Sequence, residues 1–146
     1  MVKINISKAV GLFLCLIPVA ANACTLSKSL PGQHVELFFE RNSSVLSSAD
    51  VVKLASWTVD MKLGYPVHLW TVVVGVATPD EKKASTLAAE RATVAKKLIT
   101  EFGLTKAPIE IKSYVDHWPE SKSNENESRA VTIQLSPGCP KDCCEN

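Results

Sequence analysis

The residue with the clearest chemical potential in this sequence is Arg91. At 100° per residue it falls in the middle of the apolar face of a predicted helix, four residues after Leu87 and three before Val94. A guanidinium there can lie along the helix edge with its charge in water. It can also point inward and pair with a carboxylate, because its planar fork suits one fixed in the protein or carried by a ligand. The sequence leaves both orientations open.

A second group with chemical potential is the set of cysteines near the two ends of the chain: Cys24, Cys139, Cys143 and Cys144. In an exported protein an even number of cysteines predicts disulfides. Vicinal cysteines rarely bond to each other without strain, so we expect Cys143 or Cys144 to reach Cys24 or Cys139. A periplasmic thiol or metal protein that uses the C-terminal thiolates is the alternative.

Other candidate catalytic or metal-binding groups are weaker. The chain has no G-x-S-x-G elbow, H-E-x-x-H helix or phosphate-binding loop, which predicts a protein that is not an enzyme and uses no cofactor. His34, His68 and His117 lie on separate predicted elements and do not assemble a metal site. We interpret the adjacent Asp80 and Glu81 as acidic residues that the dipole of a helix start favours, rather than as a catalytic pair.

Residues 1–23 have the features of a secretory signal peptide. Two lysines precede an apolar run from Ala9 to Ala21, and Ala21-Asn22-Ala23 comes directly before Cys24. The run is too short to span a bilayer comfortably, and no later run approaches the roughly 20 residues that a membrane helix needs. We expect a periplasmic protein without a transmembrane span. Acylation of Cys24 would associate it with the outer membrane, and this lipid anchor remains an alternative.

The charge balance excludes one class of partner. Sixteen Lys and Arg residues stand against fifteen Asp and Glu residues, so the chain lacks the positive excess that binding to nucleic-acid phosphates requires. An apolar content of 46% is ordinary for a globular protein of 146 residues and predicts a single compact domain.

Hydrophobic periodicity predicts strands and helices in the order β-α-β-α-β-β. Alternation with a period of two predicts strands at 35–39, 109–115 and 130–135, and an apolar run predicts a central strand at 67–77. A helix is expected from about Glu81 to Phe102, ended by Gly103 as a left-handed cap.

The other helix is expected from Ser47 or Ser48, as its cap, to about Leu63. Its apolar stripe, which we expect to face the core, consists of Val51, Val52, Ala55, Val59 and Leu63. The resulting organisation is a signal peptide at 1–23, an N-terminal segment at 24–34, a domain at 35–135 and a cysteine-rich tail at 136–146. A polar stretch at 116–128 is long enough to be a functional loop.

Three motifs resemble the OmpA-like peptidoglycan-binding domain found in OmpA, the Pal lipoprotein and MotB. Leu87-Ala-Ala-Glu-Arg-Ala92, with Val94 and Leu98, is similar to the pattern L-S-x-x-R-A-x-x-V-x-x-x-L of that family. Residues 35–46 are similar to its opening F-x-x-x-S-x-x-L, and Ser128-Arg-Ala-Val-Thr-Ile133 to its N-R-R-V-x-I. The resemblance spans 35–135 and implies an α+β domain in which a mixed sheet packs on helices.

The same resemblance implies a set of peptidoglycan-binding residues. In the family, the helix arginine and an aspartate after the second strand hold the zwitterionic end of diaminopimelate in the peptidoglycan stem peptide. Arg91 matches that arginine and Arg129 matches the last arginine of the family pattern. Thr78 stands where the G-x-T-D turn of the family has its aspartate, and Asp80 follows two residues later. The implied site is therefore Arg91, Thr78, Asp80 and Arg129, without the family's aspartate.

The sequence predicts an exported envelope protein that binds peptidoglycan non-covalently through a degenerate site. The alternative is an OmpA-fold accessory that has lost peptidoglycan binding and presents Trp57, His117-Trp118 or the tail to an envelope protein partner. The missing aspartate favours this alternative, because an ammonium group desolvated without a counter-charge costs several kcal/mol.

Overall fold

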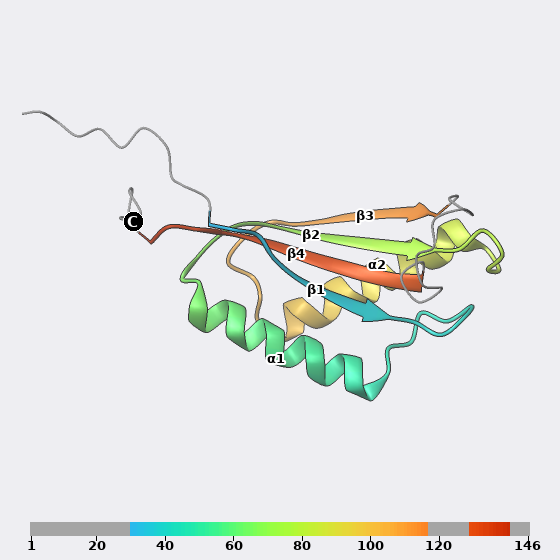
Figure 1. Ribbon diagram of the computed structural model, residues 1–146, viewed down its shortest axis with the longest axis horizontal. Coiled ribbons are helices and arrows are strands. Elements are labelled where there is room, and N and C mark those ends of the chain that lie inside the picture. Colours follow the sequence, from blue (N-terminus) through green and yellow to red (C-terminus); the bar gives the residue numbers. More distant parts are fainter. Residues whose placement is uncertain (1–29, 117–128, 141–146) are drawn as a thin grey trace, which may run out of the picture.

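The computed structural model describes residues 30–116 and 129–140. They form a four-stranded sheet with two helices on one of its faces (Figure 1). The elements are β1 (Gln33–Phe38), α1 (Ser48–Gly64), β2 (Val67–Ala77), α2 (Ala84–Glu101), β3 (Ile109–Val115) and β4 (Ala130–Gly138). The predicted α+β class and the β-α-β-α-β-β order are confirmed. The predictions for the signal peptide, for His117-Trp118 and for Cys24, Cys143 and Cys144 lie outside the described residues.

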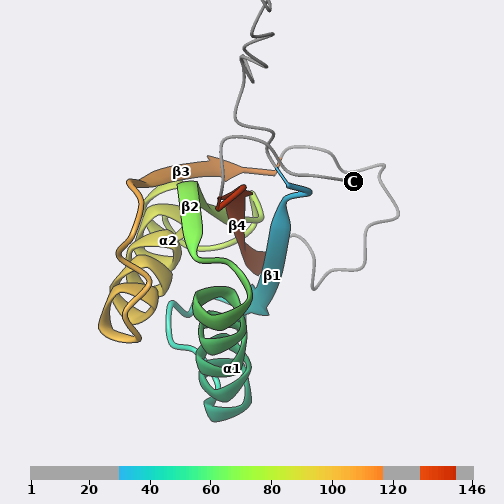
Figure 2. The same ribbon diagram turned by 90° about the vertical axis from the view of Figure 1, so that its left-hand side faces the viewer.

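The strand order in the sheet is β1-β4-β2-β3. The last strand of the chain, β4, lies between β1 and β2 and is antiparallel to both, whereas β2 and β3 are parallel and are connected through α2. Seen along the sheet, α2 lies beneath β2 and β3, and α1 lies beneath β1 (Figure 2). The mixed sheet packed on helices that the sequence predicts is therefore present.

The core lies between the sheet and the helices. Alternate residues of β1 and β4 point into it, with Val35 opposite Ile133 and Leu37 opposite Val131. From below, α1 contributes Leu54 and Met61 to the same cluster. The period-two patterns therefore identified the buried face of each of these two strands.

The prediction of which apolar face of α1 is buried was wrong. Val52 is 65% exposed and Leu63 is 81% exposed, and Val59 is exposed as well. The residues that α1 buries are Leu54, Thr58 and Met61. The helix has apolar residues on two faces, and the contact with the sheet uses the face that carries the larger Leu54 and Met61 side chains. Of the two predicted caps, Ser47 and Ser48, the structure uses Ser47, whose side chain accepts a hydrogen bond from the Asp50 N–H.

The second helix begins later than predicted, at Ala84 rather than near Glu81. Lys83 has a φ of 51°, in the left-handed region, and this interrupts the helical path between Glu81 and Ala84. Gly103 has a φ of 86° and ends α2, as its position after the helix predicted.

Neither a membrane-spanning helix nor a metal cluster occurs in the described part of the chain. The two helices are too short or too polar to cross a bilayer. No three of the described His, Cys, Asp and Glu residues group closely enough to hold a metal ion.

Gly75 is the position where β2 and α2 approach most closely. A Cβ atom at Gly75 would lie 2.1 Å from the Ala88 carbonyl oxygen and 3.0 Å from the Ala92 Cβ. Small residues on α2 let the helix backbone reach the strand, and Gly75 lets the strand accept it.

We expect Gly75→Ala to lower the free energy of unfolding by about 2 kcal/mol or more, because the added methyl group forces α2 away from the sheet. Gly64→Ala is the control, since a Cβ there meets nothing within 4 Å. The control should leave stability unchanged or raise it by up to about 1 kcal/mol. Urea unfolding of both variants measures the difference, and equal stabilities would contradict the close approach.

Candidate functional site

Arg91 lies on the buried side of α2, beneath the ends of β1 and β2. Its side chain is fully buried, with no exposed surface. The Cζ atom of its guanidinium lies 5.2 Å from the centre of the Phe39 ring, which is within the range of a cation–π contact. The inward of the two orientations that the sequence allows is therefore the one in the structure.

Every N–H donor of the Arg91 guanidinium has a partner within the protein. Its Nε donates to the Ser43 carbonyl at 2.9 Å, and its Nη1 donates to the Val76 carbonyl at 3.0 Å. Its Nη2 donates to the Glu40 carbonyl at 3.1 Å. The remaining two donors form a bidentate pair with Glu81, at 2.8 Å to Oε2 and 2.6 Å to Oε1. Because arginine has five N–H donors, none is left over for a ligand.

Glu81 is buried as completely as its partner, with no side-chain surface exposed. Besides the two bonds from Arg91, Oε1 accepts from the Asn42 N–H at 2.8 Å and Oε2 from the Thr78 N–H at 3.0 Å. Burial acts to raise the pKa of Glu81. The hydrogen bonds from Arg91, Asn42 and Thr78 outweigh it and hold that pKa below its ordinary value of 4.5. The carboxylate is therefore ionised at neutral pH.

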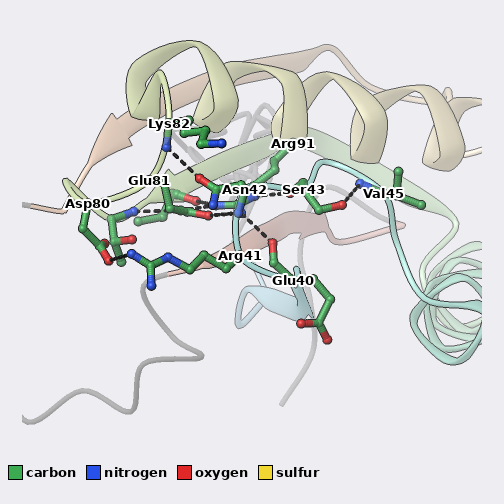
Figure 3. Close-up of polar contacts among 11 residues, drawn as sticks. Glu40, Arg41, Asn42, Ser43, Val45, Asp80, Glu81, Lys82 and Arg91 are labelled. Atoms are coloured by element: carbon green, nitrogen blue, oxygen red, sulfur yellow. Dashed lines mark hydrogen bonds and ion pairs between the residues drawn. The ribbon is translucent and has the colours of Figure 1, made fainter.

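The ion pair joins two loops that are far apart in the sequence (Figure 3). The loop after β1 contributes Asn42, whose φ of 57° turns its backbone N–H toward Glu81. The Asn42 side chain reaches the second loop directly, because its Oδ1 accepts from the Lys82 N–H at 2.7 Å. Together these contacts fix the loop after β1 against the loop after β2.

The structure places Thr78 and Asp80 beside the ion pair and not within it. Asp80 is exposed and pairs with the exposed Arg41 at 2.5 Å. The pKa of Asp80 is lowered chiefly by a hydrogen bond from the Thr78 side chain, with smaller contributions from the charges of Arg41 and Arg129. The four residues implied by the family resemblance are thus brought to one end of the sheet, with Arg91 buried and Asp80 at the surface.

Two members of the site were missed by the sequence argument, Glu81 and Asn42. The interpretation of Glu81 as an acidic residue that the dipole of a helix start favours was wrong, because the helix begins at Ala84 and Glu81 is buried against Arg91. One signal was present: an arginine in an apolar stripe needs a counter-charge, and Glu81 is among the first acidic residues after the end of β2. Nothing in the sequence singled out Asn42.

Two other features lie apart from this site. An open groove of about 480 Å³ between β1 and α1 is lined by residues that include His34, Lys53 and Trp57, and by none of the four predicted binding residues. At the far end of β4, Cys139 is buried and disulfide-bonded. Its pairing with a particular cysteine stays a prediction.

The described arrangement at Arg91 is a closed ion pair with no free donor. It offers neither an exposed acid or base nor an activated nucleophile. A ligand carboxylate could bind the guanidinium only by displacing Glu81 or some of the three backbone carbonyls.

Comparison with known proteins identifies the fold. No protein-family model matches the sequence, and no curated protein matches it. Among solved structures, the chain is similar to the OmpA-like domain of FopA1 from Francisella tularensis subsp. tularensis SCHU S4, with a TM-score of 0.60, 15% identity and coverage of 93% of this chain and 98% of that one.

Two further solved structures support the same fold. The C-terminal domain of Helicobacter pylori MotB gives a TM-score of 0.59 at 20% identity, covering 74% of this chain and 88% of that one. The peptidoglycan-associated lipoprotein from Burkholderia pseudomallei gives 0.54 at 14% identity, covering 68% and 88%. The chain therefore has the OmpA-like fold that the sequence motifs predicted.

We expect Glu81→Gln to lower the free energy of unfolding by about 3–5 kcal/mol, because it leaves the guanidinium buried without a counter-charge. The control is Asp80→Asn, which removes an exposed charge and its pair with Arg41, in which the two side chains are 59% and 61% exposed. Its unfolding midpoint should stay close to wild type. Adding Arg91→Gln to Glu81→Gln should cost less than the sum of the two single changes. Additive losses would contradict a coupled pair.

The lowered pKa of Glu81 predicts that acid destabilises the fold. Because the unfolded-state pKa of 4.5 lies above the folded one, the contribution is fully present above pH 4.5 and is lost as the pH falls through the folded pKa. Urea unfolding at a series of pH values should give a steeper acid loss for the wild type than for Glu81→Gln. Parallel profiles for the two proteins would contradict the assignment.

Proposed function

We propose that this chain, which has the OmpA-like fold, is an exported and non-enzymatic accessory protein of the bacterial cell envelope that acts through protein contacts. In this proposal the site at which the resembling family holds the stem peptide is closed. The internal carboxylate of Glu81 takes the place on Arg91 that a ligand carboxylate would take.

One observation carries the proposal: all five guanidinium donors of Arg91 end on groups of the protein itself. A stem-peptide carboxylate that took the place of Glu81 would expel it from the guanidinium. This would leave a buried carboxylate with only the backbone donors of Asn42 and Thr78. Breaking a buried ion pair in this way costs about 3–5 kcal/mol, which would weaken binding by about two to four orders of magnitude.

Exposed apolar side chains on the surface are suited to contacts with another protein. Val52, Val59 and Leu63 are exposed along α1, and side chains of this kind are buried when proteins associate. Trp57 packs against the core and also lines the open groove beside β1. These features support an interaction module more directly than they support a site for a charged peptide.

The N-terminal residues and the proteins that share this fold support a location in the cell envelope. The signal peptide at 1–23 supports export to the periplasm, and acylation of Cys24 would add association with the outer membrane. Two of the similar structures are described as an OmpA-like domain and a peptidoglycan-associated lipoprotein. Disulfides between Cys24, Cys139, Cys143 and Cys144 fit an oxidising compartment.

A second candidate function is peptidoglycan binding through a rebuilt site. The observation in its favour is Asp80, an exposed carboxylate in the turn where the family has its aspartate. If Asp80 released Arg41, it could pair with the ammonium group of diaminopimelate. The ligand carboxylate would then need Arg129, or an opened Arg91.

Cosedimentation with isolated peptidoglycan sacculi separates the two functions. We expect the wild-type chain to stay in the supernatant under conditions in which a known wall-binding domain pellets. Pelleting that free diaminopimelate reverses, and that Asp80→Asn abolishes, would overturn the proposal and establish the rebuilt site. Glu101→Gln, which removes an exposed carboxylate at the end of α2, is the matched control and should behave as the wild type in either case.

A further inference from the structure

The two edges of the sheet are protected unequally. At the β1 edge, α1 lies alongside the strand, and Lys53 donates from α1 to the Glu36 carbonyl at 2.7 Å (Figure 2). Lys53 also covers the Phe38 ring, with its Nζ 5.6 Å from the ring centre. At the β3 edge, no described residue pairs with the outer side of the strand. An unpaired edge of seven residues is a template for another strand.

The register of the sheet determines which backbone groups of β3 are free. Pro108 accepts from the Thr71 N–H and Asp116 donates to the Ala77 carbonyl, so the even-numbered residues of this segment face β2. In a strand the backbone groups of successive residues point to opposite sides. The N–H and C=O groups of Ile109, Ile111 and Ser113 therefore point to the open edge.

The charges on β3 make this edge complementary to itself. Glu110 and Lys112 are exposed, lie on the face opposite the helices, and flank Ile111. Within one chain the Lys112 Nζ lies 3.5 Å from the Glu110 Oε1, an exposed pair that either charge can exchange for a partner across the edge. If two copies pair antiparallel about a two-fold axis at Ile111, Glu110 of each copy lies opposite Lys112 of the other. These are non-hydrogen-bonded positions, in which side chains approach most closely.

The hydrogen bonds and the charges select the same register. With the axis at Ile111, Ile111 faces its own copy and Ile109 faces Ser113, which gives about six hydrogen bonds between the chains. Moving the axis by one residue to Glu110 or Lys112 also aligns the free groups, but it sets two like charges directly opposite each other, which is destabilising. Only the axis at Ile111 forms both opposite-charge pairs.

Apolar surface at the same edge would be covered by this pairing. Ile111 is 37% exposed on the helix side of the sheet, and Tyr114 is 55% exposed. Because α2 packs beneath β2 and β3, the two copies of α2 would run about 10 Å apart, which is close to an ordinary helix-packing distance.

We propose that the open edge of β3 binds a second copy of this chain, forming a two-fold dimer with a continuous eight-stranded sheet centred on Ile111. The pairing uses none of the residues around Arg91, so it stands independently of the function proposed above.

The test uses the chain expressed with its leader and purified from the periplasm. Sedimentation equilibrium measures the dissociation constant of the dimer for the wild type and for the Glu110→Lys and Lys112→Glu variants. Non-reducing gels count disulfide-linked dimers separately. Each single reversal creates two like-charge pairs across the axis, and we expect it to raise the dissociation constant about tenfold or more. Asp60→Lys reverses a charge on α1, away from β3, and should leave the dissociation constant unchanged.

Charge complementation is the decisive arm of the experiment. An equimolar mixture of the two single variants should form a heterodimer. One variant then carries two positive charges and the other two negative ones, so both pairs across the interface again join opposite charges. The double variant Glu110→Lys with Lys112→Glu should return to wild-type affinity. Ser113→Pro should remain folded by circular dichroism and lose dimers, because it removes an N–H that points outward. A monomeric wild type, or a dimer that the single reversals leave unchanged, overturns the proposal.

Discussion

A guanidinium taken out of water in the middle of a helix is tolerated only when each of its donors is met inside the protein. Arg91 meets this condition with one carboxylate and three backbone carbonyls. These partners come from the loop after β1, the end of β2 and the loop after β2. The ion pair with Glu81 therefore fixes the conformation of one whole end of the domain, including the left-handed residues Asn42 and Lys83.

That constraint also bears on function. In a domain that binds a carboxylate through an arginine, the guanidinium has to keep donors free for the ligand. Here Glu81 holds two of them in a bidentate pair, and backbone carbonyls hold the others. The OmpA-like fold is thus present with an arginine whose guanidinium makes all of its hydrogen bonds to groups of the protein. The groups exposed nearby, Asp80 and Arg41, pair with each other.

The sheet presents a different kind of surface. The insertion of β4 between β1 and β2 leaves β1 and β3 as the edge strands. Among the residues that the structure describes, α1 and the Lys53 side chain lie against β1, and none pairs with the outer side of β3. At β3 the groups that can bind another strand are backbone N–H and C=O groups. The Glu110 and Lys112 charges on either side of Ile111 determine which register such a strand would prefer.

The sequence by itself determined the element order, the bounds of β2 and β3, the Gly103 cap, a cap at Ser47 or Ser48, and the family resemblance that predicted the fold. These depend on periodicity and on local backbone preference, which neighbouring residues set. The tertiary structure alone decided which face of α1 is buried, where α2 begins and which carboxylate meets Arg91. Val52 and Leu63 have the same apolar character as Leu54 and Met61, so the helix pattern could not choose between the faces. Glu81 and Arg91 are ten residues apart, and only the turn at Lys83 brings the carboxylate back onto the guanidinium.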